Sequence, residues 1–136
     1  MAIARNTTAE TIKPLNGAIV RRFTAGAAVA AGEIVAMQSD GFVDPANTTS
    51  AFMQPVGIAI QAATAAGQRI DVVTFGPAIC VTGGTPGATL YASDTAGEPA
   101  ESAGTNTAIV GWVESATVVF VNPVAVEVSV DGHTHA

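Results

Sequence analysis

The chain has 136 residues, enough for one domain, and about half of them are hydrophobic, mostly the small residues Ala and Val. Only 12% are charged, against roughly a quarter in an average globular domain, so part of the surface is predicted to be an interface. The single cysteine, Cys80, excludes an internal disulfide framework, and no apolar run reaches the ~18 residues that a membrane-spanning helix needs.

Positive charge is concentrated at the start of the chain. Residues 1–22 hold four cations and one acid, Glu10, a net charge of +3, whereas residues 23–136 hold Arg69 and ten acids, a net charge of −9. The four cations are Arg5, Lys13, Arg21 and Arg22. They predict contact with an acidic partner, and a solvated arm with a few charges is the other interpretation. Nucleic acid is not expected, because four spread cations are fewer than a modest phosphate footprint.

Residues 1–17 are polar and rich in threonine, with Pro14 and an Asn16-Gly17 turn, and they predict an extended N-terminal arm. From Ala18 onward, turn residues separate short apolar stretches at intervals of roughly eight to twelve residues, which is typical of an all-β sandwich or small barrel. One β domain is therefore expected over 18–130, with a flexible tail over 131–136. Strands are predicted at 18–24, 34–38, 42–44, 56–60, 69–75, 78–81, 89–91, 108–113, 117–121 and 124–130, and a short helix at 62–66.

Two parts of the chain echo each other. The stretch 32–46 resembles 87–100, because each is a Gly-led strand followed by an Asp-containing turn and a Pro-Ala pair. A Val-Gly pair then opens a further apolar strand in each copy, at 56–60 and at 110–113. The offset of roughly 46 to 55 residues suggests an internal duplication of a β unit, and chance similarity between hairpins is the other interpretation. The echoed residues include no nucleophile, base or ligand.

The last predicted strand has the clearest alternation of apolar and other residues. Its four valines, which fall on one face, are Val124, Val126, Val128 and Val130. Such a strand either closes the barrel of its own chain or pairs with a neighbouring subunit. In the second case the four valines form a subunit interface.

No catalytic constellation is visible in the sequence. The carboxylates are scattered over predicted turns, and Cys80 and Trp112 lie in apolar strands where core packing is expected. We therefore predict neither an enzyme nor a cofactor. His133 and His135 project to the same side of an extended chain and suit a transition-metal site on a threefold axis, but two incidental histidines in a frayed tail are the preferred interpretation.

Several segments, taken in chain order, make up one pattern. Its parts are a Gly-x-x-Val strand, an Asp-Gly hairpin, a Val-Gly-hydrophobic strand and a Gly-led strand of valines. The segments are 31–35, 39–46, 55–60, 66–67 and 70–73, with a looser version at 87–91 and 109–112. This pattern resembles the capsid decoration (cement) proteins of tailed bacteriophages. The motifs are scaffold motifs, and the N-terminal arm and the histidine-containing tail fall outside the resemblance.

The resemblance implies a small β-tulip-like barrel on the outer capsid surface of a virion, synthesised in the host cytoplasm. It also implies a homo-oligomer, a trimer in preference to a dimer, that binds the major capsid (coat) protein and stabilises contacts between coat subunits. N-terminal arms in that family often clamp the coat protein. The cations expected to face it are Arg5, Lys13, Arg21 and Arg22. Neither nucleic acid nor a membrane is expected as a partner.

A phage tail spike, fibre or host-adhesion module is the alternative function. In that interpretation the β domain displays a host-binding surface, and His133 and His135 hold a metal ion. Metal content after purification without a metal-affinity step distinguishes the two functions.

Overall fold

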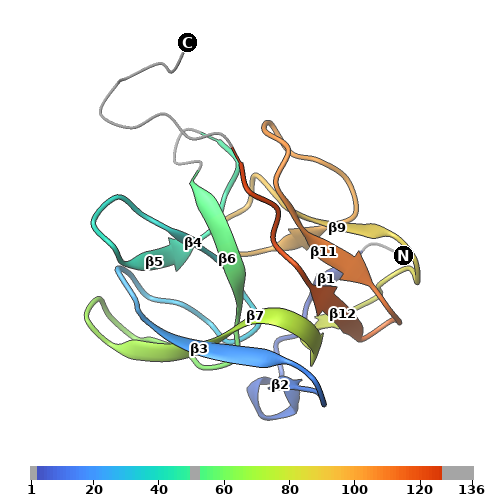
Figure 1. The fold of residues 1–136 in the computed structure, drawn as a ribbon, viewed down its shortest axis with the longest axis horizontal. Coiled ribbons are helices and arrows are strands. Elements are labelled where there is room, and N and C mark those ends of the chain that lie inside the picture. Colours follow the sequence, from blue (N-terminus) through green and yellow to red (C-terminus); the bar gives the residue numbers. More distant parts are fainter. Residues whose placement is uncertain (1–2, 50–52, 127–136) are drawn as a thin grey trace.

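The computed structural model describes residues 3–49 and 53–126, and this part of the chain is all-β, as predicted. It contains a single-turn 3-10 helix at Ala9–Thr11 and no α-helix. The strands pair in antiparallel fashion, in sheets that are not closed into a barrel (Figure 1). They are β1 (Ala4–Arg5), β2 (Lys13–Pro14), β3 (Ile19–Thr24), β4 (Ile34–Met37), β5 (Val43–Pro45), β6 (Gln54–Ala59), β7 (Arg69–Ile79), β8 (Val81–Thr82), β9 (Thr89–Ala92), β10 (Pro99–Ala100), β11 (Ile109–Val113) and β12 (Val118–Val121).

The long strand β7 joins the two parts of the sheet. Its first half pairs with β3 and β6, and its second half pairs with β12 and β2. The sequence predicted a break between 69–75 and 78–81, but the strand continues through Gly76 and Pro77. Gly76 has a φ of 104°, and a Cβ there would lie 2.7 Å from Cα of Ala18, so only glycine allows this close approach. Pro77 lacks an N–H, yet its carbonyl still accepts a hydrogen bond from the amide of Leu15.

Eight strands fall into two sets with the same connectivity. In the first set (β4–β7), β4 pairs with β5 and β6, and β6 pairs with β7. In the second set (β9–β12), β9 pairs with β10 and β11, and β11 pairs with β12. The registers also match: Ile34 lies opposite Ile58 in the first set, as Thr89 lies opposite Trp112 in the second.

A glycine occupies the matching position in each of the two sets. The ladders between β4 and β6 and between β9 and β11 shift register beside Gly57 and Gly111, respectively. A Cβ at Gly57 would lie 2.0 Å from the carbonyl oxygen of Val73, and one at Gly111 would lie 1.9 Å from that of Phe120. In both sets the neighbouring strand therefore approaches closely because the side chain is absent.

The buried apolar residues form two clusters. The main core takes side chains from both sets, among them Ile58 and Val113, and the second core lies on the other face of the first set. Residues of the loops before β4 and after β6 cover the second core, and Val29 and Ala63 join these loops through reciprocal 2.8 Å backbone hydrogen bonds. The predicted helix at 62–66 is wrong, because the backbone of Ala63 is used in this bridge.

The described N-terminal residues belong to the β domain. β1 pairs with β8, β2 pairs with β7, and the amide of Asn6 donates a 3.0 Å hydrogen bond to the carbonyl of Cys80. Ile3 and Ile12, the apolar residues of an otherwise polar stretch, are buried in the main core. Residues 3–14 of the predicted extended arm therefore pack along the domain.

Only the start of the predicted strand 124–130 lies in the described part, and residues 124–126 are not a strand. The side chain of Gln54 replaces a ladder there: its Nε2 donates to the carbonyl of Val124 (3.1 Å), and its Oε1 accepts from the amide of Val126 (2.8 Å). Val124 is exposed, whereas Val126 packs against the main core. The positions of Val128, Val130, His133 and His135 and the tail 131–136 lie outside the described residues.

Candidate binding surface

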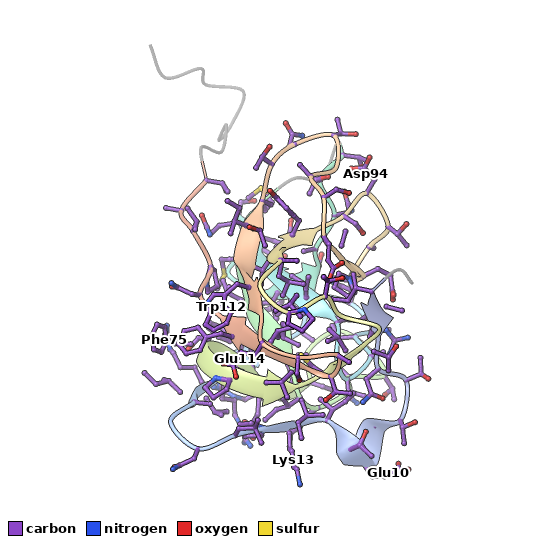
Figure 2. All side chains as sticks on the ribbon, turned by 90° about the vertical axis from the view of Figure 1, so that its right-hand side faces the viewer. Glu10, Lys13, Phe75, Asp94, Trp112 and Glu114 are labelled. Carbon is purple, nitrogen blue, oxygen red and sulfur yellow. The ribbon has the colours of Figure 1, made fainter. Side chains whose placement is uncertain are left out.

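An exposed row of apolar side chains crosses β3, β7, β12 and β11. The rings of Phe75 and Phe120 meet edge-to-face with centroids 5.1 Å apart, and the ring of Phe120 stacks on Trp112 at 5.5 Å. Ile19 lies opposite Phe75 in the ladder between β3 and β7. The exposed fractions are 53% for Ile19, 42% for Phe75 and 46% for Trp112. We call the three rings together with Ile19 the aromatic row. Figure 2 shows Phe75 and Trp112 on the same side of the molecule.

The prediction that Trp112 packs in the core is wrong. Its neighbours Gly111 and Val113 are buried, and the alternation of the strand turns Trp112 outward. Glu114, two residues after Trp112 and therefore on the same side by the alternation of a strand, is exposed as well. An acid two positions after an aromatic residue was the available signal that this face of β11 is not covered by the chain's own core.

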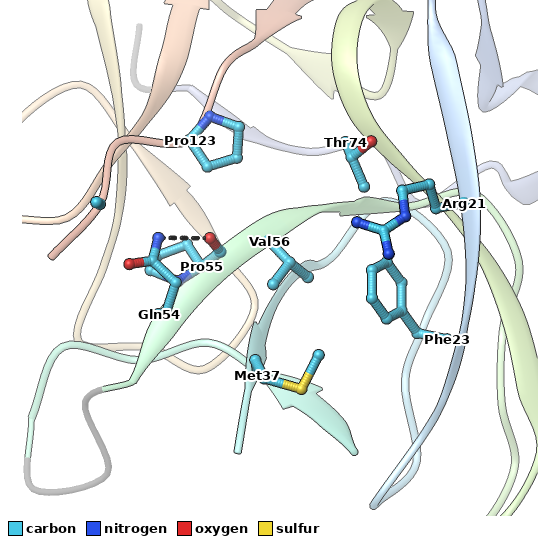
Figure 3. Close-up of a pocket in the computed structure, with 9 residues that line it drawn as sticks. Arg21, Phe23, Met37, Gln54, Pro55, Val56, Thr74 and Pro123 are labelled. Atoms are coloured by element: carbon cyan, nitrogen blue, oxygen red, sulfur yellow. Dashed lines mark hydrogen bonds between the residues drawn. The ribbon is translucent and has the colours of Figure 1, made fainter. Parts of the chain in front are cut away.

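A groove of about 610 Å³ opens beside β3, β4 and β6 (Figure 3). Phe23, Met37 and Val56 line it, and all three pack against the second core, so the groove is the uncovered continuation of that core. Arg21 stands at its rim with the guanidinium carbon 5.1 Å from the ring centroid of Phe23. Pro123 lines the other side.

The four cations predicted to contact a coat protein have different environments. Arg5 is mostly enclosed, because its Nε donates to Oε2 of Glu98 (3.0 Å) and its Nη1 donates to the carbonyl of Ala31 (3.1 Å). Arg22 is exposed and pairs with Asp71 at 3.0 Å. Lys13 on β2 and Arg21 on β3 are exposed as well. The structure therefore leaves three of the four side chains accessible, on two consecutive strands.

A polar cluster around Asp94 connects three loops. Asp94 accepts hydrogen bonds from the hydroxyl of Thr48 and from the amide (2.9 Å) and hydroxyl (2.7 Å) of Thr105, and Asn106 donates to the carbonyl of Thr48 at 2.7 Å. These bonds, that from Thr48 foremost, lower the pKa of Asp94 below its ordinary value. Because the carboxylate already has its donors, the cluster has the character of a structural connection.

Two titratable groups of the described part, Cys80 and Asp44, have raised pKa values. Burial raises the pKa of Cys80 to about 12, so the thiol stays protonated and is a poor nucleophile. Burial, and to a lesser extent the charge of Asp40, raises the pKa of Asp44, one of whose oxygens is enclosed without a hydrogen-bond partner. Within the described ranges, no three His, Cys, Asp or Glu side chains come together in a way that could hold a metal ion.

No protein-family model matches this chain, and no curated protein matches it. In the part of the chain that the structure describes, no helix is both long and apolar enough to cross a bilayer. The features that bear on function are therefore geometric: the aromatic row, the neighbouring groove and the exposed cations of β2 and β3.

Proposed function

We propose that this protein is a structural, non-enzymatic protein that decorates the outer surface of a phage capsid. It binds the major capsid protein as a homo-oligomer, preferably a trimer, and stabilises the contacts between coat subunits. The pattern that resembles capsid decoration proteins suggests this function. The observation that carries it is the aromatic row, an apolar surface on a sheet of the kind that an oligomer buries.

The aromatic row has the properties of a protein-binding surface. Large aromatic side chains dominate the energetics of protein interfaces, because each buries much area and loses little conformational entropy. Phe120 holds Phe75 and Trp112 in fixed relative positions, so this part of the surface is ordered before a partner arrives. The low content of charged residues agrees with a surface that is largely covered in an assembly.

We propose that the domain is β-tulip-like and arose by duplication of a four-strand unit. The shared connectivity and matching registers of β4–β7 and β9–β12 support the duplication. So do Gly57 in β6 and Gly111 in β11, which occupy matching positions. Two hairpins that are similar by chance would have no reason to carry a glycine at matching positions, each against a carbonyl group of the next strand.

The proposed coat contact includes the exposed cations Lys13 and Arg22. Arg21, the neighbour of Arg22 in β3, points to the opposite face of the sheet and lines the groove. Arg5 contributes less, because Glu98 and the carbonyl of Ala31 already hold its guanidinium group. The partner surface on the coat protein is therefore expected to be acidic. Many copies of a weak contact give strong decoration, because an oligomer that touches several coat subunits binds with avidity.

Co-sedimentation with empty shells of the cognate coat protein, before and after shell expansion, tests this function. We expect saturable binding at a fixed number of copies per coat subunit. Lys13→Glu should weaken binding several-fold at low salt, because it places an acid against an acidic surface. Arg69→Glu is the matched control, since it makes the same charge change at an exposed position on β7.

Absence of binding to both shells would overturn the proposal and direct the search toward a tail or adhesion assembly. Equal binding of the Lys13→Glu and wild-type proteins would remove the basic contact from the proposal.

A further inference from the structure

The two sets of strands use their faces differently. We call face A the face that carries Ile58 in the first set and Trp112 in the second, because these residues occupy matching register positions. In the first set, the four face A residues at the centre of the strands are buried in the main core; they are Ile34, Ala36, Ile58 and Val73. In the second set, the matching residues are exposed or half-exposed; they are Thr89, Tyr91, Trp112 and Phe120.

The opposite face, face B, shows the reverse. In the first set it forms the second core and the floor of the groove, with Val35, Met37, Ala59 and Val72. In the second set the matching residues are buried in the main core; they are Leu90, Ala92, Val113 and Val119. The main core is therefore built by face A of the first set together with face B of the second.

This arrangement is head-to-tail, because two different faces meet. One face of each set therefore has no partner from the other set. In the second set it is face A, which carries Trp112 and Phe120 of the aromatic row. In the first set it is face B, which carries the groove. The two loops around Val29 and Ala63 cover only part of this face B.

We propose that further copies of this chain cover both of these faces. The aromatic row of one copy packs into the groove of the next. The contact between chains then repeats the contact between the two sets within one chain. This inference rests on the homo-oligomer of the proposed function and names the surfaces that form it, in addition to the valines predicted from the sequence.

The charges at the two surfaces are complementary. Arg21 stands at the rim of the groove, and Glu114 follows Trp112 by two residues at the end of β11. A head-to-tail interface places the Glu114 of one copy toward the Arg21 of the next, whereas two aromatic rows facing each other would bring acids together.

A head-to-tail contact leaves a free row at one end and a free groove at the other, so it closes only in a ring. The full chain is therefore expected to form a cyclic oligomer in solution. Sedimentation-velocity ultracentrifugation measures this directly. We expect Trp112→Glu to be a monomer with wild-type circular dichroism, because Trp112 is exposed and the fold does not need it. Ser102→Glu, an exposed change after β10, is the control and should remain oligomeric.

Reversal of the charge pair tests the register of the contact. Arg21→Glu should weaken association about tenfold or more, because it faces Glu114 of the next copy. The double variant Arg21→Glu/Glu114→Arg should restore most of the lost affinity. Failure of the second change to restore association would show that these two residues do not meet.

Mixing distinguishes head-to-tail association from a symmetric contact. A row variant, Trp112→Glu, retains its groove, and a groove variant, Arg21→Glu/Met37→Glu, retains its row. Each should be monomeric alone, and the mixture should form a 1:1 heterodimer through the one intact interface. If both variants fold by circular dichroism and the mixture stays monomeric, the head-to-tail inference is wrong.

The remaining outcomes separate the inference from the proposed function. A wild-type protein that is monomeric at tens of micromolar overturns the inference, and loss of shell binding by Trp112→Glu would then assign the row to the coat protein. A ring that fails to bind either shell leaves the inference intact and overturns the decoration function.

Discussion

At the scale of single residues, Gly57 and Gly111 determine how closely neighbouring strands approach. Both positions lie where the ladder shifts register, and a carbonyl oxygen of the next strand occupies the space that a Cβ would take. Because that obstacle is backbone, it does not move aside as a flexible side chain does. The glycine of the Val-Gly pair in each strand is therefore a packing requirement.

Substitution by alanine tests this requirement. We expect Gly57→Ala and Gly111→Ala each to lower the free energy of unfolding by about 1–3 kcal/mol, because the added methyl overlaps a carbonyl oxygen. Urea unfolding measures the change. Gly41→Ala is the control for backbone conformation, since Gly41 has a φ of 85° and nothing lies within 4 Å of an added Cβ. A control that is destabilised more than both variants would contradict the account.

Asp94 gives a second prediction at this scale. Its lowered pKa means that the ionised carboxylate stabilises the folded state above about pH 4 and that this contribution is lost as pH falls through the folded-state pKa. Asp94→Asn should therefore lower Tm at pH 7, and the difference from wild type should shrink below about pH 4. Glu10→Gln, which removes an exposed acid, is the control. A difference that stays constant between pH 7 and pH 3 would contradict the prediction.

At the scale of elements, residues 3–14 are part of the β domain, although their sequence predicts an extended arm. β1 and β2 have two residues each, too few to show a hydrophobic period, and Ala9–Thr11 separates them. Their position is set by strands far along the chain, since β1 pairs with β8 and β2 pairs with β7. A deletion of residues 2–15 would remove buried side chains together with any contact to a partner, so it does not isolate a binding role.

A point substitution tests the same element more cleanly. Ile12→Ala should lower the free energy of unfolding by about 2–4 kcal/mol, because Ile12 is only 6% exposed and lies in the main core. Thr7→Ala, an exposed position in the same stretch, should change it by less than about 0.5 kcal/mol. Equal effects of the two changes in chemical denaturation would indicate that the stretch does not pack on the domain.

At the scale of the whole molecule, the apolar composition is divided between two cores and an uncovered surface. The main core uses one face from each set of strands, and loops only partly cover the second core. A ring of copies would bury the remaining apolar faces, and a chain with 12% charged residues has few polar side chains with which to cover them otherwise.

Association of this kind couples stability to concentration. We expect Tm of the wild-type protein to rise by about 2–6 °C for a tenfold increase in protein concentration, because assembly favours the folded state. Trp112→Glu should show no such rise. Differential scanning fluorimetry over two decades of concentration measures both, and a wild-type Tm that is independent of concentration would contradict a reversible oligomer.

The sequence by itself determined the all-β class and the approximate place of most strands, because short apolar runs between turn residues are local signals. Ile34–Met37, Arg69–Ile79 and Ile109–Val113 all fall on or across predicted strands. It also marked the Val-Gly positions, since both copies carry the same letters. These features depend on neighbouring residues and survive without knowledge of the fold.

Only the tertiary structure decided which apolar faces are covered. Ile58 and Trp112 occupy matching positions in similar strands, yet one is buried and the other is exposed, because the two sets of strands meet through different faces. The same holds for Ile12, whose burial depends on strands that begin more than fifty residues later. Burial is a property of long-range packing, so a local pattern such as an acid two residues after Trp112 indicates which face is covered only in part.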